Sequence, residues 1–233
     1  MKFGVVVFPG SNCDQDMAYA LKEQLGKNVV FLWHKDKSLK GCDFIILPGG
    51  FSYGDYLRSG AIAQFSPIMQ KIKMHAENGG FVLGICNGFQ ILCESQLLPG
   101  TLLRNKNQKF ICKNVFIKTI NTSAFGQKKI YKIPIAHAEG RYYADPATLK
   151  NIINKKQIWF KYCAENGEVN IDSNPNGSLK NIAGICNEKK TIFGMMPHPE
   201  RACDKNLNNI DGQFILESII DFCKKKRADF IQK

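Results

Sequence analysis

Residues 81–92, FVLGICNGFQIL, contain the turn around which the rest of the chain can be organised. Residues 81–85 form a short apolar run typical of a buried strand, and apolar residues then recur at helical spacing over 89–92. Between them, residues 84–88 have the form G-x-C-x-G, with Cys86 at the centre. Flanking glycines permit a sharp, strained turn that raises the central side chain above the edge of a sheet. The stretch therefore predicts a strand, a tight turn and a helix, with a cysteine at the turn.

The same alternation of strand and helix extends along the chain. Runs that are apolar on both faces, alternating with helices, indicate a parallel sheet that is covered on both sides. Between residues 110 and 143, apolar and polar residues alternate, which predicts antiparallel strands. The predicted fold class is α/β: one domain over residues 1–233, with a mostly parallel central sheet flanked by helices on both faces, flavodoxin-like, and added antiparallel strands. We predict further strands at 3–8, 29–33, 44–47, 158–163, 182–186 and 191–196, and helices at 14–25, 66–77 and 213–225.

Composition restricts the classes of function. The 233 residues, 44% of them hydrophobic, suffice for one well-packed domain, and no apolar run could span a bilayer or serve as a signal peptide, so we expect a cytoplasmic protein without a membrane partner. The formal charge is +12, but basic and aromatic residues do not interleave, so no nucleic-acid partner is expected. The nine cysteines lack the C-x-x-C spacing of a zinc site, so we predict reduced, mostly buried thiols and no metal.

Cys86 is the candidate nucleophile. In open α/β sheets, ligands bind outside the carboxyl ends of the strands, where this turn emerges. The positive end of the helix dipole there favours a thiolate, which is the nucleophilic form of cysteine. The alternative is a buried core thiol beside two glycines that merely allow close packing.

His198 and Glu200 are the candidate base and its orienting acid. A cysteine nucleophile needs a group that exchanges protons with it, and the chain has only four histidines. His198 lies in MPHPE, residues 196–200, directly after a predicted strand, and its flanking prolines favour extended backbone. Extended residues two apart point the same way, so Glu200 would lie beside His198. A solvated histidine at a strand end is the alternative.

Gly50 and Asn87 are the candidate oxyanion donors. Pro48-Gly49-Gly50 follows the predicted strand 44–47, where a glycine exposes backbone N–H groups to a ligand, and Asn87 follows the nucleophile. A simple turn is the alternative for Pro-Gly-Gly. The next segment, FSYGDYLRSG at 51–60, is unusually polar for a connection, and its side chains could position a substrate or meet a partner.

These motifs together resemble class I glutamine amidotransferases: PGG at 48–50, GxCxGxQ at 84–90 and HPE at 198–200, in that order. The similarity covers essentially the whole chain and is strongest to glutaminase subunits that serve purine biosynthesis, as in FPGSNCD at 8–14 and PIAHAEGRYY at 134–143. Ala138 departs from the pattern, in which glycine is expected. A cysteine hydrolase of the wider superfamily and a binding module without glutaminase activity are the rival classes; HPE argues against the first, and the intact triad argues against the second.

The resemblance implies a mechanism and partners. Cys86 would attack the side-chain amide of glutamine, and His198 would pass protons to ammonia and from water. Gly50 and Asn87 would hold the oxyanion, with Gln90, Phe51 and Ser52 near the glutamine. No G-x-x-x-x-G-K-[ST] loop is present, so ATP and Mg would belong to a separate large synthetase subunit, assisted by a small third subunit. The residues expected to contact these partners, with the 51–60 segment, are His137, Glu139, Arg141 and Tyr142; local hydrogen bonding is the competing interpretation.

Overall fold

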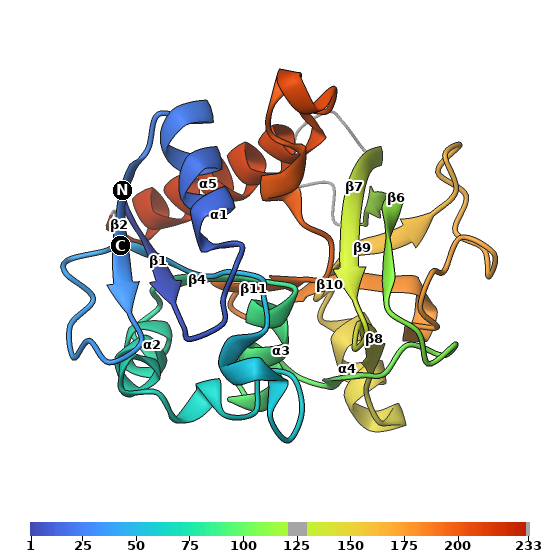
Figure 1. Cartoon of the computed structure of the whole chain (residues 1–233), viewed down its shortest axis with the longest axis horizontal. Helices are drawn as coiled ribbons and strands as arrows, with labels where there is room; N and C mark the ends of the chain where they lie inside the picture. The colour runs from blue at the N-terminus through green and yellow to red at the C-terminus, as the bar shows by residue number, and fades with distance from the viewer. Residues whose placement is uncertain (121–129, 232–233) are drawn as a thin grey trace.

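The computed structural model describes residues 1–120 and 130–231, whose strands form one mixed sheet and a separate two-stranded sheet (Figure 1). The strands of the sheet are β1 (Lys2–Val7), β2 (Asn28–Trp33), β3 (Phe44–Leu47), β4 (Phe81–Ile85), β6 (Ile111–Thr119), β7 (Ile130–His137), β9 (Ile158–Cys163), β10 (Ile182–Cys186) and β11 (Ile192–Met195). Their order is β2-β1-β3-β4-β11-β10-β9-β6-β7. The pairs from β2 to β11 are parallel, and those from β11 to β7 are antiparallel.

Helices cover both faces of the parallel part, which confirms the predicted fold class. In Figure 1, α1 (Asp14–Tyr19) and α5 (Asp211–Ile231) lie on one side of the sheet, and α2 (Pro67–Glu77) and α3 (Asn87–Glu94) lie on the other. Below the antiparallel part are α4 (Pro146–Asn154) and the two-stranded antiparallel sheet of β5 (Thr101–Leu103) and β8 (Arg141–Tyr143). Among residues 1–120 and 130–231, no helix is long and apolar enough to cross a membrane.

Several elements differ from the prediction. The helix expected at 14–25 is α-helical only to Tyr19 and continues as a π-helical turn, Ala20–Gln24, and the last helix runs beyond its predicted bounds, to Ile231. The antiparallel strands expected between 110 and 143 are confirmed as β6, β7 and β8, although residues 121–129 of that range lie outside the described residues. β5 and α4 were not predicted. Helix α4 carries a local signal, because the Asp145 carboxylate caps it by accepting the N–H groups of Ala147 and Thr148, both at 3.0 Å.

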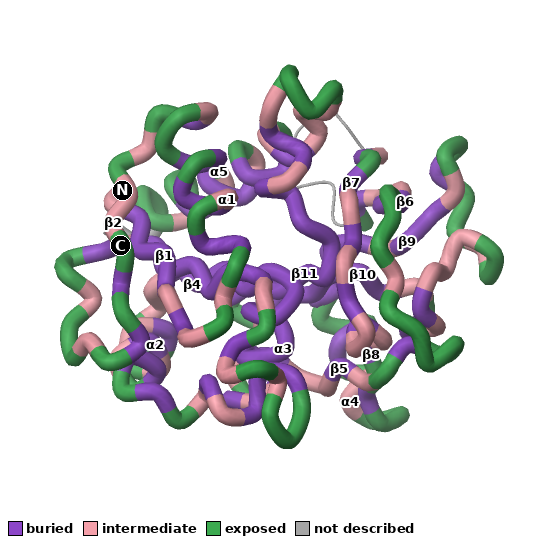
Figure 2. The backbone as a smooth tube through the Cα atoms, in the orientation of Figure 1, coloured by how far each residue is buried: buried purple, intermediate pink, exposed green. Residues whose placement is uncertain are grey.

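Close approach of α3 to β3 depends on a glycine. Figure 2 shows the central strands β4, β11 and β10 as a buried layer through the middle of the molecule, with α3 beside it. A Cβ atom at Gly88 would lie 1.9 Å from the carbonyl oxygen of Leu47, so only glycine lets the helix begin this close to the strand. The contact fixes where the turn at Cys86 sits.

Replacing Gly88 by alanine is expected to lower the free energy of unfolding by about 3 kcal/mol, because backbone atoms must separate to admit the methyl group. Urea unfolding followed by circular dichroism measures the loss. Gly79→Ala is the control: it has open space around it and a φ of +80°, so it is expected to cost only about 1 kcal/mol. Equal losses for the two variants would contradict the packing argument.

Candidate active site

Cys86 occupies a strained turn between β4 and α3. Its backbone lies at φ 50° and ψ −106°, a conformation that residues other than glycine rarely adopt. Two hydrogen bonds hold it: the Cys86 N–H donates to Met195 O at 2.8 Å, and the Gln90 N–H donates to Cys86 O at 3.1 Å. The thiol is buried, with its sulfur 3.7 Å from Ala136 O. The turn thus directs the sulfur to a defined place at the carboxyl end of the parallel strands.

His198 reaches the same place from the neighbouring strand. β11 pairs with β4 in parallel, with Met195 opposite Ile85, so residues just beyond the two strands meet. His198 Nδ1 lies 2.7 Å from Glu200 Oε1, and both side chains are buried. The predicted extended backbone is wrong, because Pro199–Ala202 form a 3-10 helix that starts directly after His198. One helical turn, rather than the alternation of a strand, brings the carboxylate to the ring.

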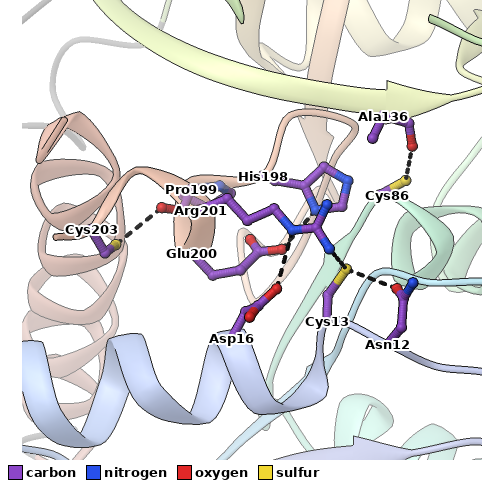
Figure 3. Close-up of polar contacts among 10 residues, drawn as sticks. All are labelled: Asn12, Cys13, Asp16, Cys86, Ala136, His198, Pro199, Glu200, Arg201 and Cys203. Carbon is purple, nitrogen blue, oxygen red and sulfur yellow. Dashed lines mark hydrogen bonds and ion pairs between the residues drawn. The ribbon is translucent and has the colours of Figure 1, made fainter. Parts of the chain in front are cut away.

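The surroundings of His198 favour the imidazolium. Burial of the ring opposes its charge, but the Glu200 carboxylate, the charge on Cys86 and hydrogen bonds with Cys13 and Cys86 outweigh burial and hold the pKa of His198 well above its usual range. His198 Nε2 is buried and has no hydrogen-bond partner among the described residues. Figure 3 shows the ring between the sulfur atoms of Cys86 and Cys13. An imidazolium beside a thiol is the arrangement that stabilises a thiolate nucleophile and can later release a proton.

A small cavity of about 210 Å³ opens onto the Cys86 sulfur. A larger cavity, of about 790 Å³ around residues 169–181, contains none of the three predicted catalytic residues. Another, of about 440 Å³, is lined by Glu200 but not by Cys86 or His198. Both charge signs are present around the small cavity. Asp55, which lines the cavity, has its pKa raised by burial. A hydrogen bond from Ser59 lowers the pKa of Asp55, and the negative charge of Glu139 raises it further. The lining residues are Gly50, Phe51, Asp55, Ser59, Cys86, Gln90, Arg104, Ala136, His137, Ala138 and Glu139.

Backbone amides near the sulfur divide into occupied and free groups. The Phe51 N–H donates to Gly10 O at 3.0 Å, and the Ser52 N–H donates to Asn87 Oδ1 at 3.1 Å. Both predicted substrate-side amides are therefore used within the domain. The Gly50 N–H makes no hydrogen bond within residues 1–120 and 130–231, and Asn87 is the first residue of α3, where N–H groups lack helical partners.

Gln90 braces this region from α3. Its Oε1 accepts a hydrogen bond from Asn87 Nδ2 at 2.9 Å, and its Nε2 donates to Glu139 O at 2.6 Å. Gln90 also lines the cavity. It thereby connects the nucleophile turn to the segment that follows β7.

Two of the four predicted partner contacts are inside the domain, which corrects the prediction for them. His137 is buried with its Nδ1 3.1 Å from Asn105 Oδ1. Tyr142 is buried too, and its hydroxyl donates to Pro99 O at 2.9 Å. Both residues serve local hydrogen bonding, the competing interpretation from the sequence. Glu139 and Arg141 are half-buried.

Cys13 and Arg201 were not predicted as site residues. Cys13 follows β1, and its sulfur, a nitrogen of His198 and an oxygen of Glu200 lie within 4.8 Å of one another. This donor set could hold a metal ion, but the Arg201 guanidinium, with Nη2 3.1 Å from the Cys13 sulfur, places a positive charge against a cation. The sequence did offer one signal for Cys13: it follows the predicted strand 3–8, and residues that follow parallel strands lie at the same sheet edge as Cys86.

Comparison with known proteins places this geometry in a family. Residues 1–218 match the CobB/CobQ-like glutamine amidotransferase domain. The subunit PurQ of phosphoribosylformylglycinamidine synthase from Moorella thermoacetica is 54% identical over 97% of this chain and 98% of that protein. The PurQ subunit from Acaryochloris marina is 51% identical, over 95% of this chain and 96% of its own length. A chain in the structure of PurLQS from Thermotoga maritima superposes with a TM-score of 0.82 at 40% identity, covering 95% of this chain and 98% of that one. The chain therefore belongs to the glutamine amidotransferase family, within the group of PurQ subunits.

Proposed function

We propose that this chain is the glutaminase subunit of phosphoribosylformylglycinamidine synthase, working in the cytoplasm in de novo purine (IMP) biosynthesis. It hydrolyses glutamine to glutamate and ammonia and delivers the ammonia to a synthetase subunit. That subunit uses ATP to convert formylglycinamide ribonucleotide to formylglycinamidine ribonucleotide. The observation that carries the proposal is the strained turn presenting Cys86 to a cavity beside the buried His198–Glu200 pair.

In the proposed reaction, the Cys86 thiolate attacks the carboxamide carbon of glutamine and forms a C–S bond. The N–H groups of Gly50 and Asn87 stabilise the negative oxygen of the tetrahedral intermediate. The C–N bond breaks as the His198 imidazolium donates its proton to the leaving ammonia, and a glutamyl thioester remains. Water then attacks the thioester, His198 accepts a proton from it, and the C–S bond breaks to release glutamate and Cys86.

The proposed partners are a large PurL-like synthetase subunit and a small PurS-like subunit, with ATP and Mg bound on the synthetase. Support comes from the solved relative, which is described as PurLQS, and from the close similarity of whole chains. This chain is proposed to need no cofactor of its own, because thiol, imidazole and backbone amides supply each step above.

The test is a reconstituted assay of amidine formation with the candidate synthetase. With glutamine as nitrogen source, product is expected only when this chain is present; with an ammonium salt, the synthetase is expected to work without it. A synthetase that gains no glutamine-dependent turnover from this chain would overturn the proposal.

We propose that the synthetase subunit docks on the 51–65 segment. The docking surface is defined as the side chains of Tyr56, Leu57 and Phe65. These side chains are 74%, 85% and 78% exposed, and exposed apolar side chains within one short segment are a feature of protein interfaces. The segment also holds Tyr53, Asp55 and Leu57 at positive φ. Such strain concentrates in functional segments.

Replacing Leu57 by aspartate is expected to weaken synthetase binding by about tenfold or more, since a charge would be desolvated at the interface. Binding is measured by titration calorimetry. Met74→Asp, a similarly exposed apolar position on α2, is the control and is expected to bind like wild type. Unchanged affinity for Leu57→Asp would place the docking surface elsewhere.

A further inference from the structure

Arg201 is next to Glu200 in the chain but bonds to other groups. Its Nε donates to Asp16 Oδ2 at 3.1 Å, and its Nη2 donates to the Cys13 sulfur at 3.1 Å (Figure 3). These bonds tie the turn after β11 to the start of α1. The guanidinium is thereby held within the field of the triad, where the charges of Glu200 and Arg201 interact.

Glu200 has an oxygen that the triad does not use. Oε1 bonds to His198, whereas Oε2 is buried and has no hydrogen-bond partner among the described residues. The side chain as a whole has no exposed surface. A buried carboxylate oxygen normally attracts the nearest donor, and a guanidinium is the strongest one at hand. Something must keep Arg201 from it.

Cys13 is fixed in the position to do so. The residue is 2% exposed, and its thiol donates to Asn12 Oδ1 at 3.2 Å and accepts from Arg201. A Cβ atom at Gly49 would meet both the Cys13 sulfur, at 3.1 Å, and His198 Cε1, at 2.6 Å, so the two side chains pack over the same glycine. Burial raises the pKa of the Cys13 thiol, against an opposing hydrogen bond with His198, and so favours the neutral form as an acceptor. Cys13 therefore acts on His198 directly through this bond as well as through Arg201.

We propose that Cys13 is a positioning residue for the triad: its sulfur holds Arg201 away from the free oxygen of Glu200, so that the full carboxylate charge acts on His198. Without the sulfur, Arg201 turns to Glu200, neutralises part of its charge and leaves the imidazolium less stable. The inference rests on the proposed function, because it assigns Cys13 a part in that same chemistry.

The charged and titratable groups around His198 come from several elements. Glu200 and Arg201 lie on its own turn, Cys86 on the nucleophile turn, and Cys13 and Asp16 at the start of α1. His137 faces it from β7, but burial, with the charge of His198 adding, lowers the pKa of His137 to about 4 and keeps that ring neutral. Of these groups, only Arg201 is a cation that removal of Cys13 would release.

The test is an NMR titration of His198 in the full chain, in a Cys86→Ala background that removes coupling to the nucleophile. The chain has four histidines, so the ring signals are few, and His198→Gln assigns the one in question. Adding Cys13→Ala is expected to lower the pKa of His198 by about one unit, a tenfold change in the proton affinity. Cys13→Ser keeps an acceptor for Arg201 and is expected to keep the pKa of His198 close to its value with Cys13 present. Adding Arg201→Met to Cys13→Ala is expected to reverse most of the fall in the pKa of His198, leaving only the part due to the lost hydrogen bond between Cys13 and His198.

Matched controls separate positioning from packing. Cys186→Ala removes a buried thiol outside the triad and is expected to leave the titration of His198 unchanged. In Cys13→Ala, the signals of the other three histidines are expected to titrate as before. If Cys13→Ala does not fold, Cys13→Val fills the site without an acceptor and makes the same comparison. An unchanged His198 titration, or a shift that Arg201→Met does not reverse, would overturn the inference. The titration needs neither glutamine nor synthetase, so its failure would leave the proposed function standing.

Discussion

Replacing Cys86 by alanine is expected to abolish glutamine turnover, with a fall of about 10⁴-fold or more in kcat. No other described cysteine lines the cavity, so no second thiol can take over as nucleophile. Glutamate release in the presence of the synthetase measures the loss. Amidine formation from ammonium salt is expected to be unaffected, because it bypasses this subunit.

Cys112→Ala is the matched control for loss of a thiol. Cys112 on β6 pairs with Ala136, but its own side chain is exposed and does not line the cavity, so this variant is expected to turn over glutamine at the wild-type rate. In wild type, mass spectrometry of acid-quenched enzyme is expected to find the glutamyl adduct on Cys86. More than about a hundredth of wild-type activity in Cys86→Ala would show that another group attacks glutamine.

Glu200→Gln is expected to lower kcat/KM by about 10³-fold to 10⁴-fold, because the amide still orients the ring but no longer supports its charge. The control is Glu188→Gln, a surface carboxylate that pairs with Lys155 and is expected to be neutral. Steady-state kinetics with saturating synthetase measures both variants. A loss below about tenfold would show that His198 does not depend on this carboxylate.

The same variant is expected to change how stability depends on pH. The pKa of His198 is raised in the folded chain by Glu200 and Cys86, against the effect of burial. A raised pKa contributes stability that is complete below the unfolded value and is lost as pH rises through the folded value. The stability advantage of wild type over Glu200→Gln is therefore expected to be largest near pH 6 and to shrink in alkaline solution, as urea unfolding at several pH values would measure.

Periodicity and turn signals were enough to predict the sheet. The runs 44–47, 81–85, 158–163 and 182–186 match strands to the residue, because buried strands need largely apolar sequence bounded by turn residues. The π-helical turn after Tyr19 was not predicted, since helical spacing is similar in both helix types. Nor was the short strand β5, whose three residues carry too little pattern.

The site was predictable where it depends on strand ends and not where it depends on side-chain packing. Cys86 and His198 follow adjacent parallel strands, so their meeting follows from topology. The 3-10 helix at residues 199–202 could not be predicted, because proline fits the first position of a helix as well as it fits extended backbone. Burial of His137 and Tyr142 depends on contacts with residues distant in sequence, as does the Cys13–Arg201 bond, and no local pattern encodes them.

The position of β11 in the sheet determines how late in translation the chain can acquire its catalytic site. The strand that carries the base is inserted between β4 and β10 and is the last of the sheet to be translated. A nascent chain can display its reactive cysteine early, but it lacks the proton donor until residues 198–200 have been made. Translation products that stop before His198 therefore cannot consume glutamine by this mechanism.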